Sequence, residues 1–259
     1  MTLESVKGQM AEIAGYLWQN GWAERNGGNM SVNITDCAKA IYDGVEPISG
    51  PFEIGLEVPH LAGSYFIVTG TGRRMRYVAS DLMSNVAIIR VSDDAKHYSI
   101  IAEQDVRPTS ELPSHLAVHD FLQTDRPQYK AVVHTHPIEL VAMSHNPKFL
   151  GKDVLSNILW SMIPETLAFC PKGLGIVPYA MPSSVELAQA TLEQLKSYDV
   201  VMWEKHGVMG VGPDLVEAFD MIDTLSKSAK IYRDSCSMGF VPEGMSQAQM
   251  LELRKAFNL

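Results

Sequence analysis

The chain has 259 residues, of which 46% are hydrophobic and 20% are charged, and these values are typical of a globular protein with a sizeable core. A formal net charge of -9, without a run rich in lysine and arginine, argues against nucleic acid or an anionic membrane as the main partner. There is no signal-peptide pattern and no apolar span of about 20 residues, and Cys37, Cys170 and Cys236 form no CxxC pair. We therefore expect a cytoplasmic protein with reduced thiols.

The first half of the chain alternates helical and strand-like patterns around polar turns. Residues 4–19 have apolar side chains at helical spacing, and a turn over 24–29 leads into an alternating strand at 30–34. Residues 36–64 are rich in glycine and proline, which predicts a long irregular excursion from the domain. Further strands are predicted at 64–69, 86–91 and 97–102.

The second half continues this alternation. Pro108-Thr-Ser-Glu111 precedes a predicted helix, and Ala131-Val-Val-His134 is typical of a buried strand. Helices are also predicted at 137–144, 153–162, 184–197, 213–235 and 245–257, and strands at 174–179 and 199–205. Interleaved strands and helices without internal repeats indicate one α/β domain over residues 1–259, built around a central sheet.

Three histidines give the clearest indication of chemistry. His134 and His136 lie at the end of the predicted buried strand, where residues i and i+2 point to one side with Cα atoms about 6–7 Å apart. His206 follows a second apolar, strand-like run and precedes Gly207. A His-x-His pair alone is also found as an ordinary core or surface pair. A catalytic zinc ion, however, takes three protein ligands and leaves one position open, so the two strand ends together predict a metal site.

Two other histidines are spaced by one helical turn. His115 and His119 lie at i and i+4 of the predicted helix that follows residue 111, a spacing that also occurs in metal sites. We interpret them instead as part of the polar stripe of this helix.

Three short polar turns are suited to binding an oxyanion. Glycine lets backbone N–H groups approach an anion closely, and hydroxyl and amide side chains add further donors. The turns are Asn26-Gly-Gly-Asn29, Thr69-Gly-Thr-Gly72 and Thr109-Ser110. Each alone is also an ordinary turn or helix cap, but together they indicate phosphate. A nucleotide is not the first choice, because the sequence has no GxxxxGK[ST] loop and no GxGxxG after a strand.

Glu111 stands at the start of a predicted helix that has Pro113 in its first turn. This is an ordinary stabilising place for a carboxylate. A carboxylate beside a phosphate turn and a metal also suits a metal ligand or a proton acceptor. The local sequence leaves both interpretations open.

These motifs together resemble the zinc-dependent class II aldolases, in order and spacing along nearly the whole chain. The resemblance rests on Glu24-Arg-Asn-Gly-Gly-Asn29, Phe66-Ile-Val-Thr-Gly-Thr-Gly72, Pro108-Thr-Ser-Glu-Leu-Pro-Ser-His115, His134-Thr-His136 and His206-Gly-Val208. It implies a central, mainly antiparallel sheet flanked by helices on both faces. The length, the 36–64 excursion and residues 160–165 are most similar to one branch of this family.

The resemblance also implies a role for each motif. His134, His136 and His206 would hold one Zn²⁺ per subunit, and Glu111 would be the catalytic acid/base. A second, mobile catalytic carboxylate would be Glu165, acting in the site of a neighbouring subunit. The phosphate pocket would consist of Asn26, Gly28, Asn29, Thr71, Gly72, Thr109 and Ser110, with Thr71 in place of an expected serine.

The implied reaction is retro-aldol cleavage of the C3–C4 bond of a 2-keto sugar phosphate in a homotetramer. Zinc as a Lewis acid would remove the need for a Schiff-base lysine. Two alternatives stay open: a sugar-phosphate epimerase or dehydratase with the same site, and a non-catalytic, adducin-like interaction domain. A zinc hydrolase is less favoured, because HExxH is absent.

Overall fold

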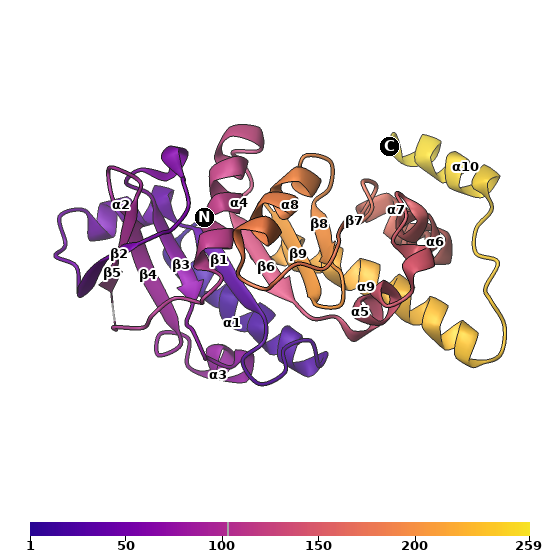
Figure 1. The fold of residues 1–259 in the computed structure, drawn as a ribbon, viewed down its shortest axis with the longest axis horizontal. Helices are drawn as coiled ribbons and strands as arrows, with labels where there is room; N and C mark the ends of the chain where they lie inside the picture. The colour runs from indigo at the N-terminus through magenta and orange to yellow at the C-terminus, as the bar shows by residue number, and fades with distance from the viewer. Residues whose placement is uncertain (103) are drawn as a thin grey trace.

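The computed structural model describes residues 1–102 and 104–259, and within them one mixed sheet forms the centre of the molecule (Figure 1). Its nine strands are ordered β2-β5-β4-β3-β1-β6-β9-β8-β7, and only the β7–β8 pair is parallel. The strands are β1 (Asn29–Asn33), β2 (Ser49–Glu53), β3 (Tyr65–Thr69), β4 (Val86–Val91), β5 (His97–Ala102), β6 (Ala131–Thr135), β7 (Gly175–Val177), β8 (Val200–Trp203) and β9 (Gly207–Gly212). The prediction of a mainly antiparallel α/β fold is confirmed.

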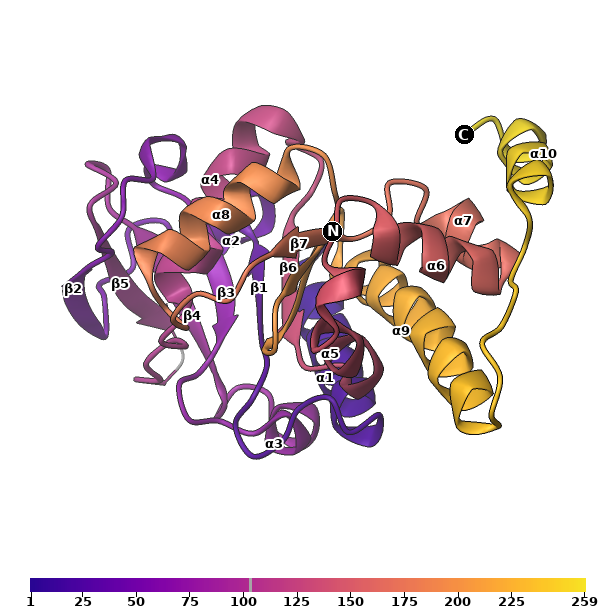
Figure 2. The same ribbon diagram turned by 45° about the vertical axis from the view of Figure 1, so that its right-hand side comes forward.

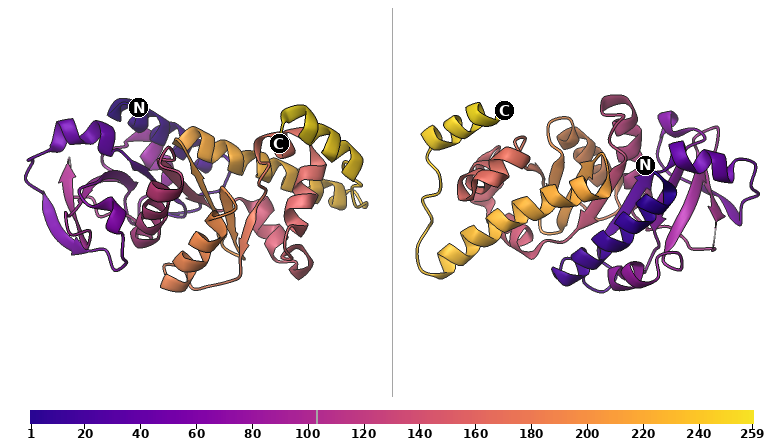
Figure 3. Two further views of the ribbon diagram at one scale, coloured as in Figure 1. Left: turned by 90° about the horizontal axis from the view of Figure 1, so that it is seen from above. Right: turned by 180° about the vertical axis from the view of Figure 1, so that it is seen from behind.

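Helices cover both faces of this sheet. The α-helices are α1 (Leu3–Gln19), α2 (Thr35–Tyr42), α3 (Met75–Ser80), α4 (Leu112–Asp125), α5 (Ile138–Ser144), α6 (Val154–Met162), α7 (Pro164–Phe169), α8 (Val185–Leu195), α9 (Leu215–Ser237) and α10 (Gln247–Phe257). Short 3-10 turns are η1 (Pro59–Leu61) and η2 (Pro147–Phe149). Helices α1, α3 and α9 pack on one face and α4 and α8 on the other (Figure 3). The C-terminal α10 lies at the far end, against α7 (Figure 2).

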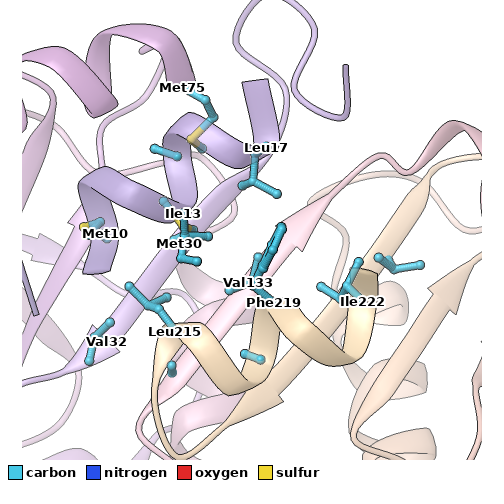
Figure 4. Packing of buried hydrophobic residues seen from close by; sticks show 14 of the residues in the cluster. Met10, Ile13, Leu17, Met30, Val32, Met75, Val133, Leu215, Phe219 and Ile222 are labelled. Carbon is cyan, nitrogen blue, oxygen red and sulfur yellow. The ribbon is translucent and has the colours of Figure 1, made fainter. Parts of the chain in front are cut away.

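Alternation along β1 sends apolar side chains to one face of the sheet and polar side chains to the other. Met30 and Val32 of β1 point into the large core formed with α1 and α9 (Figure 4). Asn29 and Ser31, between them in the sequence, therefore point to the opposite face, towards α4. Each fully buried aliphatic side chain stabilises the folded state by about 1.5–3 kcal/mol relative to an exposed one. Burial of Met30 and Val32 therefore determines which face of β1 points to the core, and Asn29 and Ser31 must point to the other face.

The segment 36–64 is not the irregular excursion expected from its glycines and prolines. It contains α2, β2 and η1, and β2 pairs with β5, so that Phe52 lies opposite Tyr98. This pairing joins residues far apart in the sequence, which local composition does not reveal.

Strand β9 was also not anticipated, because three of its six residues are glycines, which are disfavoured in strands. The structure supplies the reason, since α9 lies directly on β9. A Cβ atom added to Gly210 would be 2.9 Å from Ile222 Cδ1 and 3.0 Å from the Ala218 carbonyl oxygen. One added to Gly212 would be 2.8 Å from the Ala218 nitrogen. None of the described helices is long and apolar enough to cross a membrane.

The close contact between α9 and β9 predicts that a larger residue at Gly210 is destabilising, whereas the same substitution at an unobstructed helical glycine is stabilising. Gly210→Ala should lower the free energy of unfolding by about 1–3 kcal/mol, because the added methyl group overpacks this interface. The matched control is Gly8→Ala in α1, where an added Cβ meets nothing within 4 Å. This variant should gain about 0.4–1 kcal/mol through the reduced freedom of the unfolded chain. Urea unfolding measures both, and a Gly210→Ala protein as stable as the parent contradicts this packing.

Candidate metal centre

The predicted site residues meet where connected strands end at one edge of the sheet. Strand β1 begins at Asn29, β6 ends at Thr135, and the β8–β9 turn carries His206. The antiparallel register sets Asn29 opposite His134. One pocket at this edge is lined by Asn26, Gly27, Gly28, Asn29, Gly70, Thr71, Gly72, Thr109, Ser110, Glu111, His134, His136 and His206. It brings together every predicted site residue except Glu165.

The three histidines have the dimensions of a metal site. One ring nitrogen from each of His134, His136 and His206 lies within 4.8 Å of the others. The Nε2 atoms of His134 and His136 are 3.2 Å apart. Two nitrogens bound at about 2.0–2.1 Å to a tetrahedral zinc ion would be roughly 3.3 Å apart. The group is therefore suited to hold a metal ion.

The hydrogen bonds of two of these rings determine where their lone pairs point. His134 Nδ1 is 2.9 Å from the Val208 carbonyl oxygen, and His136 Nδ1 is 2.7 Å from Glu24 Oε1. An oxygen of either kind only accepts, so both Nδ1 atoms carry a hydrogen, and in the neutral rings both Nε2 atoms keep a lone pair. These lone pairs then face each other across 3.2 Å, and a cation between them would remove their repulsion. The donor set therefore fits a metal ion.

Burial favours the neutral, metal-binding form of the His134 and His206 imidazoles by lowering the pKa of each. It holds the pKa of His134 well below the ordinary value, and possible charges on His136 and His206 lower that pKa further. The pKa of His206 is also lowered, first by burial and then by His136, while Glu111 and Glu24 act in the opposite direction. His134 and His206 therefore need not release a proton at neutral pH to bind a metal.

The turn before β9 places His206 beside the other two rings. The backbone N–H of His206 donates to the Trp203 carbonyl oxygen at 3.0 Å. A Cβ atom added to Gly207 would be 2.5 Å from the Thr135 carbonyl oxygen and 2.6 Å from His136 Cδ2. A glycine is thus required after His206 for the turn to approach the end of β6.

Glu111 lies beside the histidines and is 7% exposed. Its Oε2 is 3.7 Å from His134 Nε2 and accepts a 2.7 Å hydrogen bond from Asn29 Nδ2. It occupies the N-cap position of α4, and its backbone N–H donates to Thr109 Oγ1 at 3.3 Å. The carboxylate therefore borders both the metal-binding group and the polar turns.

Two of the polar turns are joined by backbone hydrogen bonds. Thr71 N–H donates to the Arg107 carbonyl oxygen and Thr109 N–H to the Thr69 carbonyl oxygen, each at 2.8 Å. Gly28, in the third turn, has a φ of +75°, which a side chain would disfavour. Asn26, Thr71, Gly72 and Ser110 are exposed, whereas Asn29 and Thr109 are buried. The turns thus present hydroxyl and amide donors at the mouth of the pocket.

The structure adds functional neighbours that the sequence analysis missed. Glu24 had been noted only as part of a motif, yet its carboxylate orients His136. His115 and His119 do not form a polar surface stripe, since they are 0% and 2% exposed and both contact Ser31 Oγ. The alternation of polar and apolar residues in β1 is the signal that would have indicated a buried polar face there.

Glu165 lies apart from this group within the described part of the chain. It is exposed in the first turn of α7, and it does not line the pocket that contains the three histidines. Within a single chain the structure therefore does not bring it to the predicted site.

The chain is also similar to known proteins over most of its length. Residues 8–233 match the family of the class II aldolase and adducin N-terminal domain. The rhamnulose-1-phosphate aldolase of Bacteroides thetaiotaomicron is 59% identical, covering 97% of this chain and 93% of that protein. The enzyme of the same name from Enterococcus faecalis is 34% identical, covering 97% and 90%. The crystal structure of a sugar-phosphate aldolase from Thermotoga maritima is 34% identical, with a TM-score of 0.80 and coverage of 93% and 99%.

The contact between Glu24 and His136 predicts a loss of metal affinity when the carboxylate is removed. Glu24→Ala should weaken metal binding by about 10-fold or more, because His136 loses the group that fixes its tautomer and orientation. The control is Glu12→Ala, which removes an exposed carboxylate of α1 that bonds only Tyr16 in the described contacts. Competition with a chromophoric chelator measures both affinities. Equal affinities for Glu24→Ala and the parent would show that Glu24 does not support the site.

Proposed function

Because the chain belongs to the class II aldolase and adducin family, we propose that it cleaves L-rhamnulose 1-phosphate to dihydroxyacetone phosphate and L-lactaldehyde. The observation that carries this proposal is one pocket combining three histidines, a buried carboxylate and phosphate-type turns. The choice of sugar is supported by the 59% identity to a rhamnulose-1-phosphate aldolase. The enzyme would act in rhamnose catabolism in the cytoplasm.

The proposed metal ligands are His134, His136 and His206, and the proposed ion is Zn²⁺. Three imidazoles and an open position are the usual ligand set of a catalytic zinc ion. Such an ion would supply a Lewis acid for the C2 carbonyl oxygen, where negative charge develops as the C3–C4 bond breaks.

Glu111 is the proposed acid/base for C3. When the C3–C4 bond breaks, its electron pair moves towards the C2 carbonyl, and C3 must then gain a proton to give dihydroxyacetone phosphate. Glu111 lies 3.7 Å from His134 Nε2, at the edge of the metal-binding group, and in its protonated form it would supply this proton. In the direction of synthesis it removes the same proton.

The polar turns are the proposed site for the substrate phosphate. Asn26, Gly28, Thr71, Gly72, Thr109 and Ser110 line the pocket beside Glu111 and offer backbone N–H, hydroxyl and amide donors. Binding the non-reacting end of the sugar converts binding energy into orientation of C2 and C3. Asn29 lines the same pocket, although its side chain is engaged with Glu111.

Glu165 is the proposed acid/base for the C4 oxygen, and it would act in the site of a neighbouring subunit of a homotetramer. Its exposure on α7 and its position outside the histidine pocket of its own chain are compatible with a role in another chain. Breaking the C3–C4 bond requires loss of the C4 hydroxyl proton, and a second carboxylate supplies a base for it.

The proposed reaction is tested by incubating the zinc-loaded protein with L-rhamnulose 1-phosphate, L-fuculose 1-phosphate and L-ribulose 5-phosphate. Release of dihydroxyacetone phosphate should have the highest kcat/KM for the first sugar. Ser110→Ala should raise KM, and free L-rhamnulose should be a far poorer substrate, because phosphate binding orients the sugar.

Two outcomes would contradict this function, and a third would contradict the phosphate pocket. A higher kcat/KM for L-fuculose 1-phosphate would reassign the substrate. Epimerisation of L-ribulose 5-phosphate, with no release of dihydroxyacetone phosphate from any of the sugars, would replace the aldolase reaction by a related one. Equal kcat/KM for free and phosphorylated L-rhamnulose would contradict the proposal that the polar turns bind the substrate phosphate.

The role of Glu165 across a subunit boundary predicts complementation between two inactive proteins. Glu165→Ala and His206→Ala homo-oligomers should each be nearly inactive. Hybrids made by refolding them together should regain activity, because some sites then combine an intact histidine group with an intact Glu165. Mass spectrometry establishes that hybrids have formed. Hybrids no more active than their parents would rule out a catalytic role of Glu165 in a neighbouring site.

A further inference from the structure

A continuous chain of buried hydrogen bonds leads from Glu111 into the interior between β1 and α4. Asn29 Nδ2 bonds Glu111 Oε2 at 2.7 Å, and Asn29 Oδ1 bonds His115 Nε2. Ser31 Oγ then lies 2.7 Å from His115 Nδ1 and 2.8 Å from His119 Nε2. No member of the chain is more than 7% exposed.

The chemistry of the groups sets one direction for every bond. Glu111 as a carboxylate only accepts, so Asn29 donates to it through Nδ2 and accepts through Oδ1. His115 must then donate through Nε2. Burial lowers the pKa of His115 to about 4, so this ring is neutral and its Nδ1 accepts from the hydroxyl of Ser31. The oxygen of Ser31 in turn accepts from His119 Nε2, and all four donors point towards Glu111.

We propose that Asn29, His115, Ser31 and His119 form a positioning relay that holds the Glu111 carboxylate in its working orientation beside the metal-binding histidines. The proposal rests on the acid/base function proposed for Glu111. The relay acts by fixing the amide of Asn29, whose Nδ2–H then fixes Oε2 of Glu111. It therefore assigns Asn29 to the carboxylate in place of the phosphate role that the sequence predicted.

The surroundings of the relay argue against a role in packing alone. It lies against apolar side chains on both sides, since Leu112 and Leu116 of α4 belong to one core cluster and Val118 and Leu122 to another. Phe66 packs against His119 with ring centroids 4.9 Å apart and the ring planes tilted by 48°. Apolar residues would fill such an interface without the desolvation of two imidazoles, a hydroxyl and an amide. The polar chain, by contrast, delivers a directed hydrogen bond to the Glu111 carboxylate, which lines the pocket.

The first test compares Ser31→Ala with a matched control. Ser156→Ala also removes a buried hydroxyl that bridges two partners, the N–H and carbonyl groups of Leu174, and it lies outside the relay and the pocket. Both variants should lose similar thermal stability and keep their zinc. Ser31→Ala should lose about 10-fold in kcat with little change in KM, which is less than the roughly 10²–10⁴-fold contribution of an acid/base group itself. Ser156→Ala should keep the kcat of the parent.

Two further comparisons separate positioning from general damage. Ser31→Ala should have almost no additional effect on kcat in a Glu111→Gln background, because the relay acts only through that carboxylate. His115→Gln places an amide donor near the position of Nε2, so it should retain more kcat than His115→Leu. An unchanged kcat in Ser31→Ala, a full additional loss in the Glu111→Gln background, or equal kcat for both His115 variants would overturn the relay.

The direction of the relay is measured without any reaction. Ring ¹⁵N shifts of histidine in the zinc-loaded protein should show His115 and His119 as neutral Nε2–H tautomers at pH 7. An Nδ1–H tautomer at either ring, or an imidazolium, would overturn the proposed direction. If the parent protein cleaves no sugar phosphate, the proposed function fails, whereas these shifts still decide whether the relay exists.

Discussion

The register of β1, β6 and β9 is the constraint on which the site depends. It sets Asn29 opposite His134 and His134 opposite Met209. Because side chains alternate between the two faces of a strand, a slip by one residue would turn His134 into the apolar core and bring Val133 to the site. The register is itself held by burial, since Met30 and Val133 face the core formed with α1 and α9. The free energy of core packing thereby positions the polar groups on the opposite face.

A second constraint is electrostatic. In the neutral rings, the hydrogen bonds from His134 to Val208 and from His136 to Glu24 leave two nitrogen lone pairs 3.2 Å apart. Such an arrangement is favourable around a cation, so it fits a metal ion. The relay through Asn29, His115 and Ser31 ends on the carboxylate beside these nitrogens. His134, His136 and Glu111 thus each have a hydrogen-bond partner that limits the orientation of the side chain, as is required for a pre-organised site.

Much of the fold and of the site could be predicted from the sequence, because the patterns that indicate them span only a few neighbouring residues. Helix α1 and strands β4 and β5 follow directly from apolar periodicity, and the His-x-His pair at the end of β6 marks one edge of the sheet. Strands β2 and β9 could not be predicted, because their sequences are rich in glycine or proline and long-range pairing stabilises them. His115 and His119 are buried because the face of α4 that carries them packs against β1. Tertiary packing determines which face of the helix is buried, so the local sequence does not predict it.

The central claim is that Glu111 and the three-histidine site act together on a proton at C3. The most direct measurement is solvent deuterium incorporation into dihydroxyacetone phosphate by the zinc-loaded protein, with no aldehyde present. The account predicts exchange at one hydrogen of the hydroxymethyl carbon, lowered by roughly 10²-fold or more in Glu111→Gln with unchanged zinc content. An unchanged exchange rate in Glu111→Gln would mean that another residue moves this proton and would contradict the account.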